Sequence, residues 1–164
     1  MKFYKFLLSS SFSILMSALV GCQNDNIDEE HHYDNTVYVT TKAITDDLLI
    51  KESVSDASRA IAYRLASPAT YDVTVSFEAK PQMAAAYNLA FNDNAEALLA
   101  DYFELPSKSV TIKAGDISSE DVIINFKNTD KLDKSKRYVL PVSIVDANID
   151  ILKSKQTVYF VFKG

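Results

Sequence analysis

Glycine, cysteine, histidine and tryptophan are scarce in this sequence, and each scarcity excludes a class of function. The 164 residues include three glycines, one cysteine, two histidines and no tryptophan. Three scattered glycines build neither a dinucleotide fingerprint nor a phosphate-binding loop, and one cysteine allows no Cys-rich zinc site. His31 and His32 are neighbours in a polar segment, which we interpret as a linker. We therefore expect no cofactor, no metal and no catalytic residue.

The charge balance excludes a further class of partner. The chain has 22 acidic and 17 basic side chains, which give a formal net charge of −5. Binding to a nucleic acid backbone requires clustered lysine and arginine, so we expect no nucleic acid partner. Hydrophobic residues make up 48% of the chain, which is too high for a disordered protein. The length is normal for one domain with its own core.

The first residues have the pattern of a secretory signal. Lys2 and Lys5 precede a mostly apolar run over residues 6–20. This run is shorter than the about 20 apolar residues of a membrane-spanning helix. It leads into Leu-Val-Gly-Cys at residues 19–22, which resembles the bacterial lipobox. We therefore expect residues 1–21 to be a lipoprotein signal peptide and Cys22 to carry the lipid that binds the membrane.

The segment after Cys22 is hydrophilic and acidic. Residues 22–35 contain five acids and no lysine or arginine, so we expect a flexible tether. An acidic run beside the lipidated cysteine resembles the surface-export signal of Bacteroidota lipoproteins, whereas the alternative is a merely solvated spacer. The first interpretation predicts a lipid-anchored protein of the outer membrane that is exposed at the cell surface.

From Thr36 to the end, apolar residues mostly alternate with polar ones, which is typical of half-buried strands. The pattern predicts strands over 36–42, 59–66, 71–78, 109–114, 120–127, 138–145 and 157–163, with a weaker candidate over 47–52. Strands at this spacing, with turn residues between them, predict an all-β fold over 36–164, an immunoglobulin-like β-sandwich with a short helical insertion. Pro141 should place its strand at a sheet edge or at a bulge.

The same alternation predicts which side chains point inward. Six are expected in the core: Val75, Phe77, Ile112, Ile124, Val142 and Phe160. Four are expected to face water or the other side of their sheet: Thr74, Ser76, Thr111 and Lys113. Tyr63 and Tyr138 also lie in apolar register and should be buried.

The middle of the chain changes to helical spacing. Pro81 suits the first turn of a helix, and Met83, Tyr87, Ala90 and Phe91 then recur on one face. A second short helical turn is expected near Leu98–Phe103. The aromatic stripe either forms a ligand surface or caps the open end of the core. The following Asn-Asp-Asn at 92–94 lacks the acidic ladder and glycine of a calcium loop.

An ordered series of short motifs resembles a known family. The motifs are Ala-Tyr-Asn at 86–88, Tyr-Phe-Glu-Leu at 102–105, Val-Thr-Ile-Lys-Ala-Gly at 110–115, Tyr-Val-Leu-Pro-Val at 138–142 and Thr-Val-Tyr at 157–159. They resemble an uncharacterised domain found at the N-terminus of Bacteroidota surface lipoproteins, often ahead of a chitinase-like hydrolase or a lectin-like module. This sequence departs from the family at 92–94, where a glycine-containing turn is usual, and it stops where the domain is expected to end.

The resemblance implies a non-catalytic role in glycan binding or polysaccharide utilisation, with glycans or other surface lipoproteins as partners. Exposed aromatic rings are suited to sugars, and Tyr71 and Tyr102 lie near expected loops. A structural adhesin or pilin-like subunit that associates by strand addition is the alternative. A glycosidase needs a pair of carboxylates in a cleft, and no motif indicates one.

Overall fold

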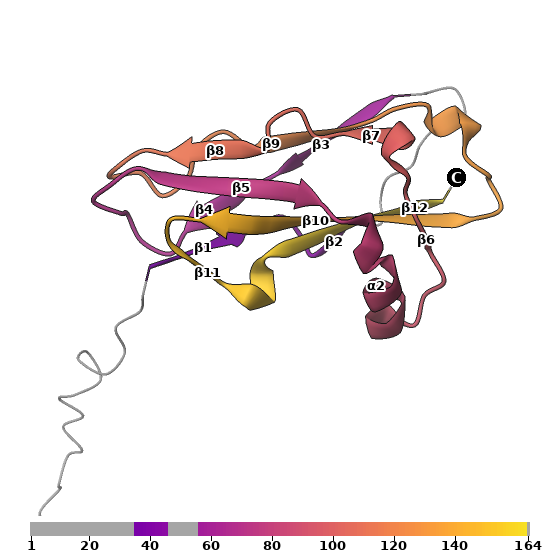
Figure 1. Ribbon diagram of the computed structural model, residues 1–164, viewed down its shortest axis with the longest axis horizontal. Coiled ribbons are helices and arrows are strands. Elements are labelled where there is room, and N and C mark those ends of the chain that lie inside the picture. The colour runs from indigo at the N-terminus through magenta and orange to yellow at the C-terminus, as the bar shows by residue number, and fades with distance from the viewer. Residues whose placement is uncertain (1–34, 46–55, 164) are drawn as a thin grey trace, which may run out of the picture. The chain divides into compact units, whose positions relative to one another are not determined.

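The computed structural model describes residues 35–45 and 56–163, all of which belong to one compact unit. Cys22, the predicted signal peptide and tether, and the weak strand candidate over 47–52 lie outside the described residues. The described part consists mainly of strands arranged in three sheets, with one short α-helix between strands β5 and β6 (Figure 1). The predicted all-β sandwich with a helical insertion is confirmed.

The large sheet has the strand order β2-β12-β10-β5-β8, and β6 pairs with β10 beside this path. Its strands are β2 (Ile44–Thr45), β5 (Val73–Ala79), β6 (Glu96–Ala97), β8 (Ser109–Ile112), β10 (Arg137–Ala147) and β12 (Thr157–Lys163). The long strand β10 lies in the middle, antiparallel to β12 on one side and to β5 on the other. A bulge interrupts the β10–β5 pairing between Ile144 and Asp146.

Two smaller sheets complete the sandwich. The first has the order β11-β1-β4, with β1 (Thr36–Val39), β4 (Tyr63–Leu65) and β11 (Asp150–Ile151). The second has the order β3-β9-β7, with β3 (Ala57–Ile61), β7 (Phe103–Glu104) and β9 (Val122–Phe126). Buried residues of all three sheets form one main core, so the two small sheets face the large one.

The predicted single strand over 59–66 is wrong in one respect. The chain leaves β3 at Ala62 and continues as β4 in the other small sheet. The Ala62 carbonyl accepts a hydrogen bond from the Thr40 N–H at 2.9 Å, and the Ala62 N–H donates to the Thr41 hydroxyl at 2.8 Å. Because the residues on both sides of Ala62 keep their alternation, Ile61, Tyr63 and Leu65 are all buried as predicted.

The main core confirms the predicted directions of the side chains. All six residues expected to point inward are at most 2% exposed, and Tyr63 and Tyr138 are also buried. Thr74, Thr111 and Lys113 are exposed, and Ser76 is half-buried. The Phe126 ring is the centre of an aromatic group, since it contacts Phe160 and Phe162 edge-on with ring centroids 5.6 Å apart in both pairs.

Of the two positions predicted for the strand of Pro141, the sheet edge is wrong, because β10 is paired on both sides, whereas β10 does carry a bulge, between Ile144 and Asp146. Pro141 lies opposite Tyr159 of β12. The Ile144 N–H donates to Gln156 on the β12 side, so the alternation of the strand turns the nitrogen of Pro141 to the opposite side. On that side the neighbour of β10 changes from β6, which pairs with Val139, to β5, which begins its pairing at Val142. The proline therefore occupies a gap in the ladder, where its missing N–H leaves no partner unpaired.

The helical segments are short. They are the 3-10 turn η1 (Pro81–Met83), the helix α2 (Ala84–Phe91) and the further 3-10 turns η2 (Ala100–Tyr102), η3 (Thr129–Lys131) and η4 (Lys153–Lys155). Both helical predictions for the middle of the chain are confirmed, with Pro81 at the first position of η1 and η2 as the second turn. In the part of the chain that the structure describes, no helix is both long and apolar enough to cross a membrane.

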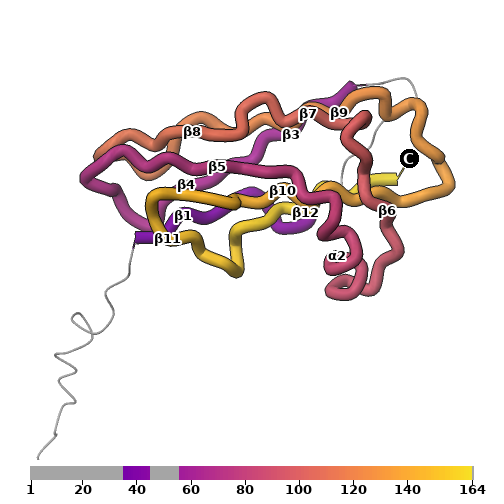
Figure 2. The backbone as a smooth tube through the Cα atoms, viewed as in Figure 1, coloured from indigo at the N-terminus to yellow at the C-terminus, as the bar shows by residue number. Residues whose placement is uncertain are grey.

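The first described strand begins and the last one ends at opposite ends of the sandwich. In Figure 2, β1 begins at one end of the sandwich and β12 finishes at the other. The turn between β10 and β11 lies near the first end, whereas α2, β6 and the start of β10 lie toward the second. The two ends therefore present different side chains, and each carries one of the two hollows described next.

Candidate ligand-binding face

Helix α2 covers part of the outer face of the large sheet. Ala84 and Tyr87 of the helix are buried with Ala95, Val139 and Val161 in a second, smaller core. Val139 and Val161 lie directly opposite each other on β10 and β12, and they point away from the main core. Ala85, Ala86 and Ala90 are exposed, and Leu89 is 88% exposed. The helix is therefore held by one narrow face.

The helix ends in a turn that requires a left-handed residue. Asn92 has φ 51° and ψ 47°, a conformation that glycine adopts freely and asparagine tolerates better than most residues. This explains how the sequence departs from a glycine-containing turn without losing the turn. The Asn88 side chain fastens the loop, because its amide group both donates to the Ala95 carbonyl at 2.9 Å and accepts from the Ala95 N–H at 3.0 Å.

Three aromatic rings meet at the end of α2. The Tyr87 ring lies 5.0 Å from Phe91 and 5.2 Å from Tyr159 of β12, and the Phe91 and Tyr159 rings are 5.8 Å apart. Tyr87 is buried, whereas Phe91 is 46% exposed and Tyr159 is half-buried. The aromatic stripe expected from the sequence is therefore divided between a small core and solvent. Tyr87 belongs to the small core, and Phe91 presents a supported ring to solvent.

Asp93 joins these rings to the charged residues beside them. Its carboxylate accepts hydrogen bonds from the Tyr87 hydroxyl at 3.1 Å and from Arg137 Nε and Nη2 at 3.2 and 3.0 Å. Its other oxygen accepts from the Asn94 N–H at 2.8 Å. Burial alone would raise the pKa of Asp93, but these hydrogen bonds outweigh it and hold the pKa below its usual value.

The same contact affects Tyr87. Burial and the neighbouring Asp93 carboxylate raise the pKa of the Tyr87 hydroxyl, so Tyr87 remains a donor at neutral pH. The Asp93 side chain is only 15% exposed, and Arg137 shields it from solvent. The loop after α2 is thus fixed to the first residue of β10 by an ionised, fully engaged carboxylate.

A polar groove of about 470 Å³ lies beside Arg137. Its lining residues are Asn94, Glu96, Ser135, Lys136, Arg137 and Lys163. Lys136 forms an ion pair with Glu96 at 2.7 Å, and Ser135 donates its hydroxyl to Asp133 at 2.7 Å. The ring of Phe91 is linked to the Asp93–Arg137 pair and the groove through Tyr87, which contacts Phe91 and bonds to Asp93. We call these residues together the α2 face.

The α2 face combines the two kinds of group that a sugar can use. A half-exposed aromatic ring can stack on the C–H face of a pyranose, and the amide, hydroxyl and charged groups of the groove can bond its hydroxyl rim. The described residues contain no group of three or more His, Cys, Asp or Glu side chains placed to hold a metal ion. The groups of the α2 face are suited to reversible binding through stacking and hydrogen bonds.

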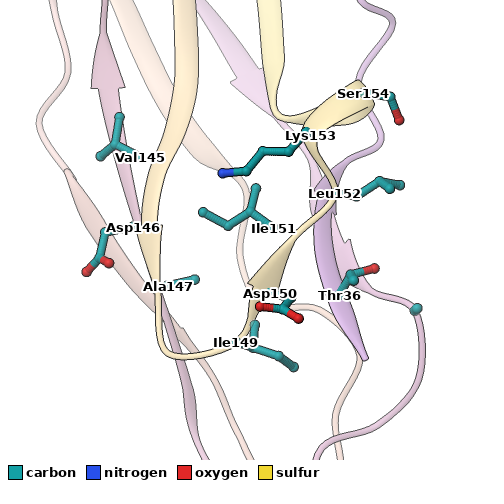
Figure 3. Close-up of a pocket in the computed structure, with 11 residues that line it drawn as sticks. Thr36, Val145, Asp146, Ala147, Ile149, Asp150, Ile151, Leu152, Lys153 and Ser154 are labelled. Carbon is teal, nitrogen blue, oxygen red and sulfur yellow. The ribbon is translucent and has the colours of Figure 1, made fainter. Parts of the chain in front are cut away.

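A larger hollow of about 1030 Å³ lies at the other end of the sandwich. It is formed by the β10–β11 turn and the start of β1, and aliphatic side chains such as Val145, Ile149 and Ile151 line much of it (Figure 3). In Figure 3, Ile151 and Lys153 extend toward the strand that carries Val145, while Asp146 points away. The described residues that line it include no aromatic side chain, so it offers a sugar no stacking surface.

The structure does not bring the two tyrosines proposed from the sequence together. Tyr71 is 49% exposed in the turn before β5, and Tyr102 is half-buried against the main core at the end of η2. The start of β5 and strand β7, which follows Tyr102, lie toward opposite ends of the sandwich (Figure 1). Cys22 lies outside the described residues.

Sequence reasoning did not assign Tyr159, Asp93 or Arg137 to a site. A signal was present for Tyr159, because the alternation of the last strand points its side chain to the other face of the sheet from that of Phe160, which is the outer face. No such signal links Asp93 to Arg137, which are 44 residues apart and meet only through the fold.

The comparisons with known proteins identify the family. A family model described as an N-terminal domain matches residues 33–151, and the chain belongs to this N-terminal-domain family. The resemblance to an N-terminal domain of Bacteroidota proteins is confirmed. A search of curated proteins finds no match.

Solved structures from Bacteroides share the fold. A candidate carbohydrate-binding protein from Bacteroides ovatus has a TM-score of 0.68 at 21% identity, over 78% of this chain and 36% of that one. A protein of unknown function from the same species has a TM-score of 0.57 at 19% identity, over 77% and 43%. EndoBT-3987 from Bacteroides thetaiotaomicron, solved with a Man5GlcNAc product, has a TM-score of 0.52 at 18% identity, over 65% and 26%. The chain thus spans less than half the length of each of these proteins, and the likeness concerns the fold.

Proposed function

We propose that this protein is a lipid-anchored, non-catalytic protein of the bacterial outer surface that binds glycans through the α2 face. The observation that carries the proposal is the half-exposed ring of Phe91, which packs against Tyr87 and Tyr159. Tyr87 and Asp93 link this ring to Arg137, which lines a polar groove. A ring held in place in this way loses little freedom when a sugar stacks on it. The fold shared with a candidate carbohydrate-binding protein supports the proposal.

The state of the carboxylates supports a binding role in place of catalysis. Glycoside hydrolysis needs a carboxylic acid that can donate its proton to the leaving oxygen. At the α2 face, Glu96 is paired with Lys136, and Asp93 is held ionised by Arg137 and Tyr87. The lowered pKa of Asp93 is the opposite of the raised pKa that such an acid requires.

The first test concerns stacking on Phe91. The full chain, purified in detergent, is measured for binding to a panel of soluble neutral and charged polysaccharides. We expect the Phe91→Ala variant to bind at least about tenfold more weakly than the unchanged protein, because the stacking surface is lost. Phe91→Leu should lose binding too, since it keeps apolar volume without an aromatic face.

The matched control is Leu89→Ala on the same helix. Leu89 is the most exposed apolar side chain of α2 and lies outside the aromatic group, so its removal should leave binding unchanged. Urea unfolding of each variant separates lost binding from lost folding. Equal binding by Phe91→Ala and Leu89→Ala would contradict a glycan site at Phe91, and no binding to any polysaccharide would contradict the proposed role.

The second test concerns the anchor. The charged start, the apolar run and the lipobox-like residues before Cys22 support lipidation of its thiol. We expect Cys22→Ala to abolish labelling by a palmitate analogue and to release the protein from the membrane fraction, because two or more acyl chains are needed for stable anchoring. Labelling of the Cys22→Ala variant at the level of the unchanged protein would rule out this anchor.

A further inference from the structure

The polar groove beside Arg137 carries an excess of positive charge on an acidic protein. Its lining residues contribute three cations, Lys136, Arg137 and Lys163, and one carboxylate, Glu96. The chain as a whole has a formal net charge of −5. The groove therefore attracts anions locally, although the protein as a whole is negatively charged.

The strand register places two of these cations side by side. Arg137 and Lys163 are direct partners across the antiparallel pair β10–β12, so both side chains leave the sheet on the same outer face. Like charges in directly opposite positions destabilise a sheet. Asp93 compensates the charge of Arg137 from behind, and Glu96 compensates Lys136. Among the described residues, Lys163 has no ion-pair partner, so its charge is available to a ligand.

A chain of contacts links the aromatic ring to the cations. Tyr87 contacts the Phe91 ring on one side and bonds to Asp93 on the other, and Asp93 bonds to Arg137 at the wall of the groove. A polysaccharide that stacks on Phe91 and extends past Tyr87 and Asp93 would place a further sugar residue at the groove. Neutral donors and acceptors of Asn94 and Ser135 line the same groove and suit the hydroxyl groups of that residue.

We propose that the α2 face selects glycans that carry carboxylate or sulfate groups, with Lys163 as the main residue for charge recognition. This inference rests on the proposed function, since it assumes that the α2 face binds glycan. It names the chemical class of the ligand, which is an anionic polysaccharide held by stacking on Phe91 and by the positive groove.

The experiment uses pairs of polymers that differ only in charge. Binding of the full chain in detergent is compared for dextran sulfate against dextran, and for polygalacturonate against its methyl ester. We expect at least one charged polymer to bind about tenfold or more tightly than its neutral counterpart, and we expect this difference to shrink as salt is raised. The two pairs distinguish sulfate from carboxylate recognition. Poly-glutamate serves as a polyanion without sugar.

Two variants with the same change in net charge test the position. Lys163→Glu should remove most of the preference for the charged polymer. Lys153→Glu is the control, because Lys153 is also an exposed lysine but lines the hollow at the other end of the sandwich. Urea unfolding of both variants confirms that each is folded. An equal loss in the two variants would overturn the assignment to this groove.

The remaining outcomes separate this inference from the proposed function. Binding that depends on Phe91 but is equal for charged and neutral polymers overturns the charge preference and leaves the glycan role intact. Equal binding of poly-glutamate overturns the selection of anionic glycans, since the groove would then recognise any polyanion. Failure of every polysaccharide to bind overturns the proposed function and this inference with it.

Discussion

Replacement of Phe160 by alanine is expected to lower the free energy of unfolding by about 3–5 kcal/mol. The side chain is fully buried at the middle of β12, and its ring meets Phe126 edge-on at 5.6 Å. Because β12 is paired with β10 along its whole length, the strand cannot move inward to fill the space left by the ring. The loss is a large share of the roughly 5–15 kcal/mol that stabilises a typical domain. Urea unfolding of the purified protein measures it.

Lys113→Ala is the control for this experiment. Lys113 follows strand β8 and forms an ion pair with Asp72 at 2.7 Å, but both side chains are largely exposed to water. Such surface pairs contribute little, so the change should be no more than about 0.5 kcal/mol. Equal unfolding midpoints for the two variants would contradict the inward position of Phe160 and the register of the sandwich.

Val161→Asp is expected to destabilise the protein by about 3 kcal/mol or more, although Val161 points away from the main core. The side chain is 1% exposed because α2 covers it, and it lies opposite Val139 across the β10–β12 pair. A carboxylate at this position would be buried among apolar groups without a partner, so it must either take up a proton or displace the helix. Urea unfolding and the far-ultraviolet signal of the helix report the two effects.

Val145→Asp is the control, because it introduces the same aspartate at a β10 valine that no described helix covers. Val145 lies at the bulge of β10 and is 38% exposed, so an aspartate there can reach water. We expect this variant to lose less than about 1 kcal/mol. If Val161→Asp were as well tolerated as Val145→Asp, the small core beneath α2 would contribute nothing to the stability of the fold.

The alternation of apolar residues predicted the strands and their inward faces because it is a local property. Each strand that packs on a core must place every second side chain toward it, so Phe77, Ile112 and Phe160 could be assigned from their own neighbours in the sequence. The helical insertion was predictable for the same reason, since Pro81 and the spacing of Tyr87 and Phe91 depend only on nearby residues.

The pairing between strands was less predictable, because it depends on residues far apart in the chain. The alternation through Ile61, Tyr63 and Leu65 continues across the point where the chain changes sheets at Ala62, so the pattern carries no sign of the change. The edge alternative for Pro141 was wrong because the rule concerns a missing hydrogen bond, and the point where one neighbouring strand gives way to the next satisfies that rule as well as an edge does.

The candidate site was recoverable only in part. The helical spacing predicted an aromatic stripe that includes Phe91, and it left two roles open for this stripe, a ligand surface or a cap of the core. It did not show which residues of the stripe are buried and which are exposed. The groove depends on Asp93, Arg137 and Lys163, which come from one loop and the ends of two strands, and only the β10–β12 register brings the last two together. Nearness to an expected loop indicated Tyr71 and Tyr102 as candidate binding residues. This criterion does not show whether the two loops lie close together in the fold.

The separation of the two ends of the sandwich has a mechanical consequence. A force applied between the start of β1 and the end of β12 would act along the strands, because both strands run along the long axis between the two ends (Figure 1). Under such a load the seven residue pairs that join β12 to β10 resist together as a shear contact, and the ladder cannot open one hydrogen bond at a time. Forced unfolding is governed by the unfolding rate, and we expect this rate to stay low when seven residue pairs must separate together. A domain built in this way can transmit a pull from one end to the other while it remains folded.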